Sequence, residues 1–591
     1  MAGKAGPKHL LNDAESLVVE SLRGLCYANP HLRLLEADKV VYLKNVEEVA
    51  QRQVTLISGG GSGHEPAHAA YIDEAMLSAA VCGQVFASPS ANQVLAAIRK
   101  VKSPHGTLVI VKNYTGDCLH FGLAVERAKA EGIKVDMIIV GDDVAVGREK
   151  GGLVGRRGLA ATALVHKVAG AFARSGGTLQ QVREAAQYVV DNSATIGVGL
   201  NHCHVPGSSS ESDMLKPNEI EIGMGIHNEP GFEKTNLPTV KKLVEQMLHR
   251  ILDKNDKDRA YVDISANDCV TLMVNNLGGT PALELGAVIK EATEYLQAQQ
   301  IRIGTVLSGP FMTSLNMPGF SLTLLKHSAS KSLDVAHAIA MPTGAPGWTN
   351  KVVQGFNADV IDNTVGLGDM EFQLADETLG KISNGQQFLN AIQSATQSVI
   401  EAEPDITHYD TVLGDGDCGQ SLKAGALAIQ RHLGNLPSDN APASIIEISS
   451  LIDKNMGGTS SAIYCIFLNA LAGGVVDACT ETKTKDVTPD IWARASQKAL
   501  DALQKYTPAR KGDRTLMDVL IPFIDRLSTS PSVKDALQAA EEGAEATKAM
   551  RATLGRASYV NDESVASANV PDAGAWGLLC LLRGLVKGLQ Q

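Results

Sequence analysis

Apolar and polar residues alternate in two different rhythms along this chain. In the first rhythm, short apolar runs separate amphipathic segments, and the most distinct runs lie at residues 54–61, 106–117, 134–143, 269–279 and 320–327. Runs that are apolar throughout indicate strands buried on both faces of a sheet. The segments between them have the pattern of amphipathic helices, for example at residues 90–101, 122–132 and 237–252. This alternation predicts an α/β domain over residues 1–340.

The second rhythm begins near residue 384. Residues 341–383 are rich in proline, glycine, asparagine and threonine and have no clear strand pattern, so we expect a linker there. From residue 384 to residue 591, apolar residues recur at steps of three and four, most clearly at residues 386–403, 493–503 and 533–550. This periodicity predicts an all-helical C-terminal domain.

Composition and charge limit the class of protein. The 591 residues are 44% hydrophobic and 20% charged, which is typical of a globular chain. The net charge of −12, without a basic cluster, argues against nucleic-acid binding. No run reaches the ~18–20 uninterrupted apolar residues of a membrane span, and the first residues lack a secretory signal. The nine scattered cysteines favour reduced thiols. We therefore expect a soluble, cytoplasmic protein that binds neither nucleic acid nor membrane.

Glycine-rich and polar residues follow two of the predicted strands. Residues 58–66, SGGGSGHEP, would let a ligand approach backbone N–H groups closely. Their spacing is that of neither a dinucleotide fingerprint nor a Walker loop, and a plain tight turn is the alternative. The next strand ends in residues 112–117, where Lys112 and Asp117 bracket a turn. These two side chains could converge on one small polar ligand, although a salt-bridged turn is the alternative.

A third polar segment, residues 223–231, places His227 between glycines and ahead of a proline. An unprotonated imidazole nitrogen in such an accessible position can add to a carbonyl carbon. Residues 202–204, His-Cys-His, suggest a zinc site instead. Adjacent side chains of an extended segment point to opposite faces, however, so we expect no metal there.

Three carboxylates gather in the predicted helical domain, at Asp410, Asp415 and Asp417. Carboxylates at this density repel one another unless a divalent cation compensates their charge. The run lacks the alternating ligands and the closing glutamate of a calcium-binding EF-hand loop. Magnesium held together with nucleotide phosphates fits the pattern better, and a solvated acidic turn is the alternative.

Other segments of this domain could bind an anion. Residues 457–461, GGTSS, precede a predicted helix and offer backbone N–H groups and hydroxyls. Arginines beside glycines, which could neutralise phosphates, stand at residues 511–515 and 554–559. With the three aspartates, these segments predict a nucleoside-triphosphate site that has neither a P-loop nor a protein-kinase signature.

Taken in order, these motifs resemble those of the single-chain, ATP-dependent dihydroxyacetone (glycerone) kinases. The shared motifs run along nearly the whole chain and include SGGGSGHEPAH, GQVFASPS, VKNYTGD, GDDVAVGREKGG, VGRRGLA, MGIHNEPG, VNNLGG, GDGDCG, MGGTS and GRASY. The resemblance implies a two-part α/β substrate domain followed by an antiparallel helical barrel that binds ATP. It also implies an enzyme that moves the γ-phosphoryl group of MgATP to a hydroxyl of dihydroxyacetone, and of glyceraldehyde.

The resemblance implies roles for residues at matching positions. His227 would hold the substrate carbonyl covalently as a hemiaminal, and His64 and Asp117 would orient or deprotonate the attacking hydroxyl. The dihydroxyacetone pocket would be lined by Gly61, Ser62, Gly63, His64, Ser88, Lys112 and Asp117. Magnesium would be held by Asp410, Asp415 and Asp417. ATP would contact Cys418, Gly419, Gln420, Ser421, Thr459, Ser460, Arg514, Thr515, Asp572, Ala573 and Gly574.

Three positions depart from the family pattern. Ala573 stands where the family has proline, Ser461 stands where glycine is usual, and Ala70 stands where glycine is common. The first two border the expected ATP site, so we expect their consequence to be a changed affinity for ATP.

Other functions remain to be weighed against the kinase. A lyase that cyclises the phosphate of FAD could use the same aspartates and needs no captured carbonyl. A non-catalytic triose sensor is disfavoured because all three aspartates are present. The two predicted sites lie on different domains and must meet, either within one chain or between the chains of a homodimer. The family precedent favours the homodimer.

Overall fold

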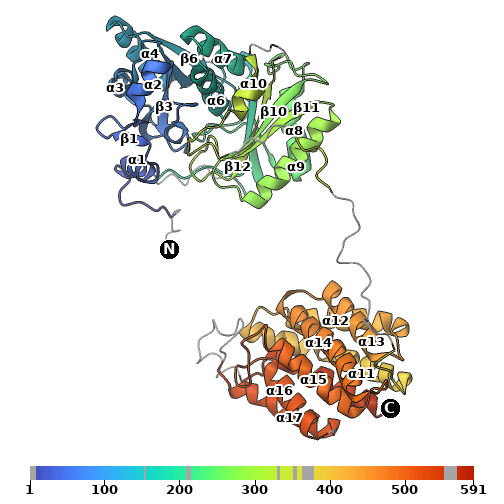
Figure 1. The fold of residues 1–591 in the computed structure, drawn as a ribbon. Coiled ribbons are helices and arrows are strands. Elements are labelled where there is room, and N and C mark those ends of the chain that lie inside the picture. Colours follow the sequence, from blue (N-terminus) through green and yellow to red (C-terminus); the bar gives the residue numbers. More distant parts are fainter. Residues whose placement is uncertain are drawn as a thin grey trace. The chain divides into compact units, whose positions relative to one another are not determined.

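The structure is a computed structural model (Figure 1). It describes residues 8–151, 155–207, 215–328, 330, 333–349, 356–361, 378–530, 532–551 and 569–591. The contacts between Cα atoms divide the chain into two compact units, Met1–Asp362 and Asn363–Gln591. The first of them, the α/β unit, contains both sheets, and the second, the helical unit, is built from helices.

The first half of the α/β unit is built on a six-stranded sheet with the order β1-β2-β4-β3-β5-β6. Its strands are β1 (Leu32–Leu35), β2 (Val40–Leu43), β3 (Thr55–Ser62), β4 (Ala79–Val85), β5 (Thr107–Lys112) and β6 (Val135–Val140). The last four strands of this order run parallel, whereas β1 and β2 form an antiparallel edge. All of β5 and nearly all of β3 are buried, because helices cover the sheet.

The helices of this half pack in pairs on the sheet, α3 with α4 and α6 with α7. The helices are α1 (Leu17–Ala28), α2 (Val46–Arg52), α3 (Ala91–Val101), α4 (Thr115–Ala130), α5 (Arg148–Gly151), α6 (Ala161–Arg174) and α7 (Leu179–Asp191). Two of them start at a capping box, in which Ser90 opens α3 and Thr178 opens α7. The predicted helix at residues 90–101 is therefore confirmed. The helix predicted at residues 122–132 is part of α4, which begins earlier, at Thr115, and ends at Ala130.

The second half of the α/β unit is built on another six-stranded sheet, with the order β11-β10-β12-β7-β8-β9. Its strands are β7 (Ser193–Gly199), β8 (Glu219–Ile222), β9 (Glu233–Asn236), β10 (Cys269–Asn276), β11 (Arg302–Gly309) and β12 (Gly319–Lys326). Only β10 and β11 pair in parallel. The helices of this half are α8 (Val240–Leu252), α9 (Ala282–Ala298) and α10 (Val335–Ala340). The predicted two-part α/β domain is thus confirmed, although periodicity did not identify the short polar strands β8 and β9.

The first residues assigned to the linker belong to the α/β unit. The backbone N–H of Gly347 donates to the carbonyl of Ala70, and Trp348 is buried against Phe311. The buried ammonium of Lys167 on α6 donates to the carbonyls of Ala338 and Met341. Tertiary packing therefore holds a segment that has no regular pattern of its own. Residues 350–355 and 362–377 of the assigned linker lie outside the described residues.

The described part of the helical unit contains helices and no strand, which confirms the all-helical prediction. Its α-helices are α11 (Gly385–Leu413), α12 (Cys418–His432), α13 (Ala441–Asn455), α14 (Gly458–Thr482), α15 (Pro489–Leu503), α16 (Met517–Thr529), α17 (Val533–Ala546) and α19 (Ala573–Leu589). Gly419 lets α12 start close to α11, because a Cβ at Gly419 would lie 2.7 Å from the backbone nitrogen of Thr407.

Helix α14 is the one described helix that is long and apolar enough to cross a membrane, judged by length and composition alone. A core helix of a globular protein passes the same test. Residues of α14 contribute to each of the four apolar clusters of the helical unit, for example Phe467, Leu468, Ala472 and Val475. One third of its most apolar window is buried inside the described structure.

Candidate active site

Two histidines from distant parts of the sequence meet in the α/β unit. His64 follows β3, and His227 lies in the loop between β8 and β9. Their Nε2 atoms are 3.0 Å apart. His64 is fully buried, and its Nδ1 lies 2.8 Å from the carbonyl oxygen of Thr313. Burial, and next the positive charge of Lys112, hold the pKa of His64 well below its usual range.

Glu229 binds the other ring nitrogen of His227. Its Oε1 lies 2.8 Å from Nδ1 of His227, and its Oε2 accepts the backbone N–H of the same residue at 2.8 Å. Burial alone would raise the pKa of Glu229, but the hydrogen bond and charge of His227 lower it to about 2. The carboxylate is therefore ionised at neutral pH and holds His227 with its Nε2 directed at His64.

Two aromatic rings enclose the histidine pair. The rings of Phe86 and Tyr114 stand edge-on to His227, with centroids 5.0 and 4.7 Å away, and Phe86 also stacks on His64 at 5.2 Å. The buried hydroxyl of Tyr114 has no hydrogen-bond partner among the described residues. It remains available for a polar ligand beside His227.

Lys112 and Asp117 converge above the backbone of Gly60. A Cβ at Gly60 would lie 3.2 Å from Oδ2 of Asp117 and 3.7 Å from Cε of Lys112. Burial lowers the pKa of Lys112 to about 8, and the negative charge of Asp117 opposes this shift most strongly. Oδ1 of Asp117 is buried and finds no partner within the described ranges. A cation and an acceptor without a partner thus share one small space, as the sequence predicted.

The other predicted pocket residues lie around this space in different ways. Gly61 passes close to the next loop, since a Cβ there would lie 2.8 Å from the backbone nitrogen of Ala87. Gly63 has a φ of +105°, in the region that favours glycine. The hydroxyl of Ser88 lies 2.8 Å from the position of a Cβ on Gly116, beside the first turn of α4. Ser62 is different, because its hydroxyl donates to the carbonyl of Gly83 and therefore serves the fold.

Sequence reasoning missed a second buried histidine pair in the same unit. Nδ1 of His68 lies 3.0 Å from Nε2 of His166 on α6, and the hydroxyl of Ser58 lies 3.2 Å from the same Nδ1. Burial lowers the pKa of His166 to about 3 and that of His68 well below its usual range. Both rings are therefore neutral. His68 ends the run HEPAH, but nothing near it in the sequence indicates its partner on α6.

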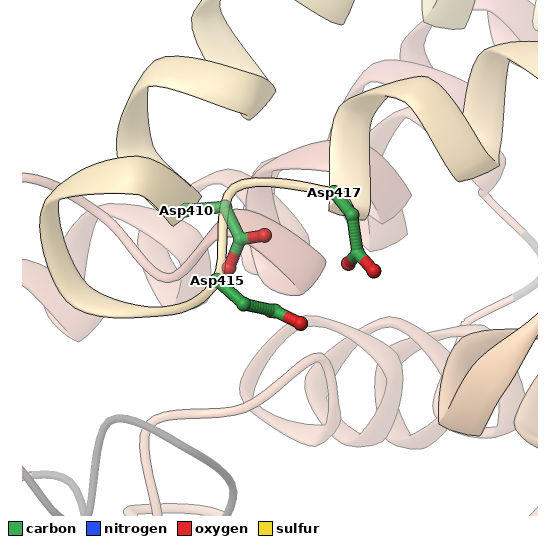
Figure 2. Close-up of side chains that lie close together, drawn as sticks. All are labelled: Asp410, Asp415 and Asp417. Atoms are coloured by element: carbon green, nitrogen blue, oxygen red, sulfur yellow. The ribbon is translucent and has the colours of Figure 1, made fainter. Parts of the chain in front are cut away.

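The three aspartates of the helical unit form a cluster that fits a divalent cation (Figure 2). Asp410 lies in the last turn of α11, Asp417 is the N-cap of α12, and Asp415 lies in the loop between them. Each offers one carboxylate oxygen, and these oxygens lie within 4.8 Å of one another. This is the one such group among the described residues. An all-carboxylate donor set suits magnesium.

Two helix N-termini lie next to this cluster. The backbone N–H of Cys418, at the start of α12, donates to Oδ2 of Asp410 at 3.0 Å. The hydroxyl of Ser421 reaches the carbonyl of Gly457, the N-cap of α14, at 3.5 Å. Thr459 and Ser460 follow in the first turn of α14 and are exposed and partly exposed. Free N–H groups at two adjacent helix ends can bind phosphate oxygens.

Arg514 is turned into the fold of the helical unit. Its side chain is 2% exposed, and its guanidinium donates to the carbonyls of Thr547 and Val570. It lies near Asp572, whose pKa is raised by burial to about 6. We therefore find Arg514 holding the loop before α19 in place. The arginine segment at residues 554–559 lies outside the described residues.

The departures from the family pattern have simple structural settings. Asp572 caps α19, and its side chain accepts the backbone N–H of Ala575 at 2.8 Å. Ala573 is therefore the first helical residue, where proline is tolerated but not required. Ser461 is 5% exposed and points into the helical unit. Ala70 lies in a short helical turn whose carbonyl accepts from Gly347.

Both units match domains of one known family. Residues 23–344 match the Dak1 domain and residues 412–587 match the DAK2 domain. The chain belongs to the dihydroxyacetone kinase family. It is 44% identical over 587 residues to "Dihydroxyacetone kinase 2" of Saccharomyces cerevisiae, covering 97% of this chain and 98% of the relative. It is 37% identical over 594 residues to "Triokinase/FMN cyclase" of Homo sapiens, covering 99% of each chain.

A solved structure of a family member has the same fold. The dihydroxyacetone kinase from C. freundii, in complex with AMP-PNP and Mg²⁺, matches with a TM-score of 0.73 at 30% identity. The match covers 98% of this chain and 100% of the C. freundii chain. The dihydroxyacetone kinase fold is thus present over nearly the whole protein.

Proposed function

We propose that this protein transfers the γ-phosphoryl group of MgATP to a hydroxyl of dihydroxyacetone, whose carbonyl is held covalently on His227. The observation that carries this proposal is the setting of His227, whose Nδ1 is bound by Glu229 while its Nε2 faces Nε2 of His64 at 3.0 Å. The protein is accordingly an ATP-dependent glycerone kinase, in agreement with its family.

Covalent capture would select the substrate. Nε2 of His227 adds to the carbonyl carbon of a short ketose or aldose, so dihydroxyacetone and glyceraldehyde are substrates whereas glycerol is not. Asp117 and His64 orient and deprotonate the hydroxyl that attacks the phosphate. Gly61, Gly63, Ser88 and Lys112 complete the pocket. Holding the substrate at one defined position supplies the orientation that phosphoryl transfer requires.

The helical unit would bind the nucleotide. Asp410, Asp415 and Asp417 are suited to hold magnesium, which neutralises charge on the phosphate oxygens when it is bound. The starts of α12 and α14 offer N–H groups and hydroxyls to these oxygens, from Cys418, Gly419, Gln420, Ser421, Thr459 and Ser460. Thr515, Ala573 and Gly574 complete the proposed nucleotide site. Thr515 follows Arg514, which binds the carbonyl of Val570, and Ala573 and Gly574 follow Asp572, which caps α19.

A second activity is favoured by the name of one relative. The human relative is a triokinase and FMN cyclase, and a reaction that cyclises the phosphate of FAD could use the same aspartates. This reaction needs no captured carbonyl, so it would survive the loss of His227. A non-catalytic triose sensor would release no ADP and would not require the carboxylate cluster.

We also propose that the protein is a cytoplasmic homodimer. Three exposed apolar side chains support self-association: Leu119 and Leu123 on α4 and Ile139 on β6, with exposed fractions of 69%, 47% and 42%. β6 is an edge strand of its sheet, and α4 packs on it. Exposed apolar side chains at and beside an edge strand are suited to contact the same side chains of a second chain.

The proposed function is tested by measuring ADP release from MgATP with and without dihydroxyacetone. We expect release that depends on dihydroxyacetone in the wild type and is lost in His227→Ala. His249→Ala is the matched control, because this histidine is exposed on α8. A rate of ADP release that does not change when dihydroxyacetone is added, or that persists in His227→Ala, would contradict covalent capture. Cyclisation of FAD that persists in His227→Ala would assign the second activity to the helical unit.

A further inference from the structure

The hydrogen-bond partners of His64 and His227 determine where their protons lie. Nδ1 of His64 faces a carbonyl oxygen, and Nδ1 of His227 faces a carboxylate oxygen. Both partners only accept hydrogen bonds, so each Nδ1 carries a proton. Two neutral rings in this state would bring two lone pairs together at the Nε2–Nε2 contact of 3.0 Å. A hydrogen bond there requires one further proton, which the two rings share.

The groups around the pair favour one of the two rings as the holder of this proton. An added proton makes the pair a cation, and Glu229 supplies the matching negative charge next to His227. His64 is buried beside Lys112, and both effects oppose a positive charge on its ring. The other titratable groups near the pair are Glu65, His68, Tyr114, Asp117 and Arg157. The proton therefore belongs to His227, with His64 as its acceptor.

We propose that Glu229 is the positioning residue of this site, which fixes the tautomer of His227 and keeps one proton between the two histidines for the capture of the substrate. This inference rests on the proposed function, because it concerns how His227 becomes the nucleophile. Nothing in the sequence motif distinguishes Glu229 from its neighbours. The assignment comes from its two contacts with one residue, at the ring and at the backbone.

The shared proton balances the capture reaction. As the substrate enters, the proton moves to Nε2 of His64 and leaves a lone pair on Nε2 of His227. This lone pair forms the bond to the carbonyl carbon, and the π electrons of the C=O bond move to the oxygen. The oxygen then takes the proton from His64 and becomes a hydroxyl. The His227 ring is left as a substituted imidazolium, whose charge Glu229 neutralises.

Glu229 is itself held in place by the surrounding loop. A side chain on Gly225 would overlap both the carboxylate of Glu229 and the guanidinium of Arg157, so these two groups lie on the same side of that glycine. Arg157 is anchored by Asp143 at 2.7 Å and donates to the carbonyl of Gly223. The carboxylate is therefore fixed in a position from which it reaches His227 twice.

Kinetics of Glu229→Gln test this role. The amide can accept one hydrogen bond but carries no charge, so we expect kcat/KM for dihydroxyacetone to fall by about 10- to 100-fold. KM for ATP should not change, because the defect lies in substrate capture. Glu233→Gln is the matched control, since Glu233 is a half-exposed residue whose carboxylate pairs with Arg250 at 3.2 Å. Wild-type kinetics in Glu229→Gln would overturn the proposal.

A spectroscopic test works on the free protein and needs no activity. In the full chain labelled with ¹⁵N-histidine, we expect Nδ1 of His227 to be protonated and its Nε2 to carry the shared proton. Glu229→Gln should mix the tautomers of His227 and leave the exposed His249 unchanged. An unprotonated Nδ1 in the wild type would overturn the inference even if that variant fails to fold. If the proposed function alone is wrong, this spectrum is still obtained but dihydroxyacetone does not alter it.

Discussion

Lys112 is a buried lysine of the α/β unit that lies near one carboxylate and two neutral histidine rings. Asp117 lies beside it over Gly60, while the neutral rings of His68 and His166 provide no charge. Burial lowers the pKa of Lys112 to about 8 from about 10.5. Between these values the unfolded chain binds a proton that the folded chain does not bind. Lys112 should therefore make the free energy of unfolding rise with pH between about 8 and 10.5.

Lys112→Met should remove this rise. We expect the free energy of unfolding of the variant to increase less steeply than that of the wild type, by about 1.4 kcal/mol per pH unit inside this window. Lys167 has a similar pKa of about 8, but it is present in both proteins and cancels in the comparison. The difference is measured by denaturant unfolding at several pH values, followed by the fluorescence of Trp348. Trp492 and Trp576 of the helical unit are replaced by phenylalanine, so that the signal reports on the α/β unit alone.

The matched control is Lys241→Met, which removes an exposed lysine of α8. Its slope should equal that of the wild type. A Lys112→Met slope that also equals the wild-type slope would mean that Lys112 titrates as it does in the unfolded chain.

At the scale of one element, α6 is the most deeply buried helix of the α/β unit. Nearly every residue from Ala161 to Ala173 is buried. The helix crosses the segment after η1 (Ala69–Tyr71), where Gly170 lies directly against the backbone of Ala75 and Met76. A Cβ at Gly170 would overlap these backbone atoms, which cannot move as the end of a flexible side chain can. Close backbone approach is the reason for glycine at this position.

Gly170→Ala should destabilise the α/β unit by about 1–3 kcal/mol, because the added methyl group overpacks a filled contact. Gly286→Ala is the matched control on α9, where no atom lies within 4 Å of the new Cβ. Helix propensity should make this second change stabilising by up to about 1 kcal/mol. Denaturant unfolding followed by Trp348 measures both changes, and equal signs would contradict the packing argument.

At the scale of the whole molecule, each unit has its own apolar core. The described core clusters of the α/β unit contain no residue of the helical unit, and the reverse also holds. The proposed substrate site lies entirely in the first unit, and the proposed magnesium site lies entirely in the second. Phosphoryl transfer therefore requires that two independently built sites meet, and the proposed homodimer offers a way for them to do so between chains.

Co-expression of two inactive variants tests this arrangement. His227→Ala disables the substrate site, and Asp415→Ala disables the magnesium site. If the sites meet between the chains of a dimer, mixed dimers regain one intact pair, and random pairing should restore roughly a quarter of the wild-type turnover. Each variant expressed alone should be inactive. No recovery in the mixture, with dimers shown by light scattering, would mean that the sites meet within one chain.

The sequence by itself determined the fold class and the order of the two units, and it predicted the residues of both proposed sites. Buried strands such as β5 and amphipathic helices such as α8 are visible because side-chain period is a local property of the backbone. The aspartates that flank the α11–α12 loop are close together in sequence and therefore also in space. The strands β8 and β9 were not visible, because each has only four residues and β9, the edge strand, is polar throughout.

Only the tertiary structure decided which distant groups meet. His64 and His227 are brought together by the packing of the two halves of the α/β unit, and no local pattern encodes that contact. The same holds for His166 and His68, and for Lys167 with the segment assigned to the linker. The pairing of the two histidines also underlies the proposed role of Glu229. The sequence shows only that this carboxylate lies two residues from His227, whereas the structure shows that it contacts one ring nitrogen while the other faces His64.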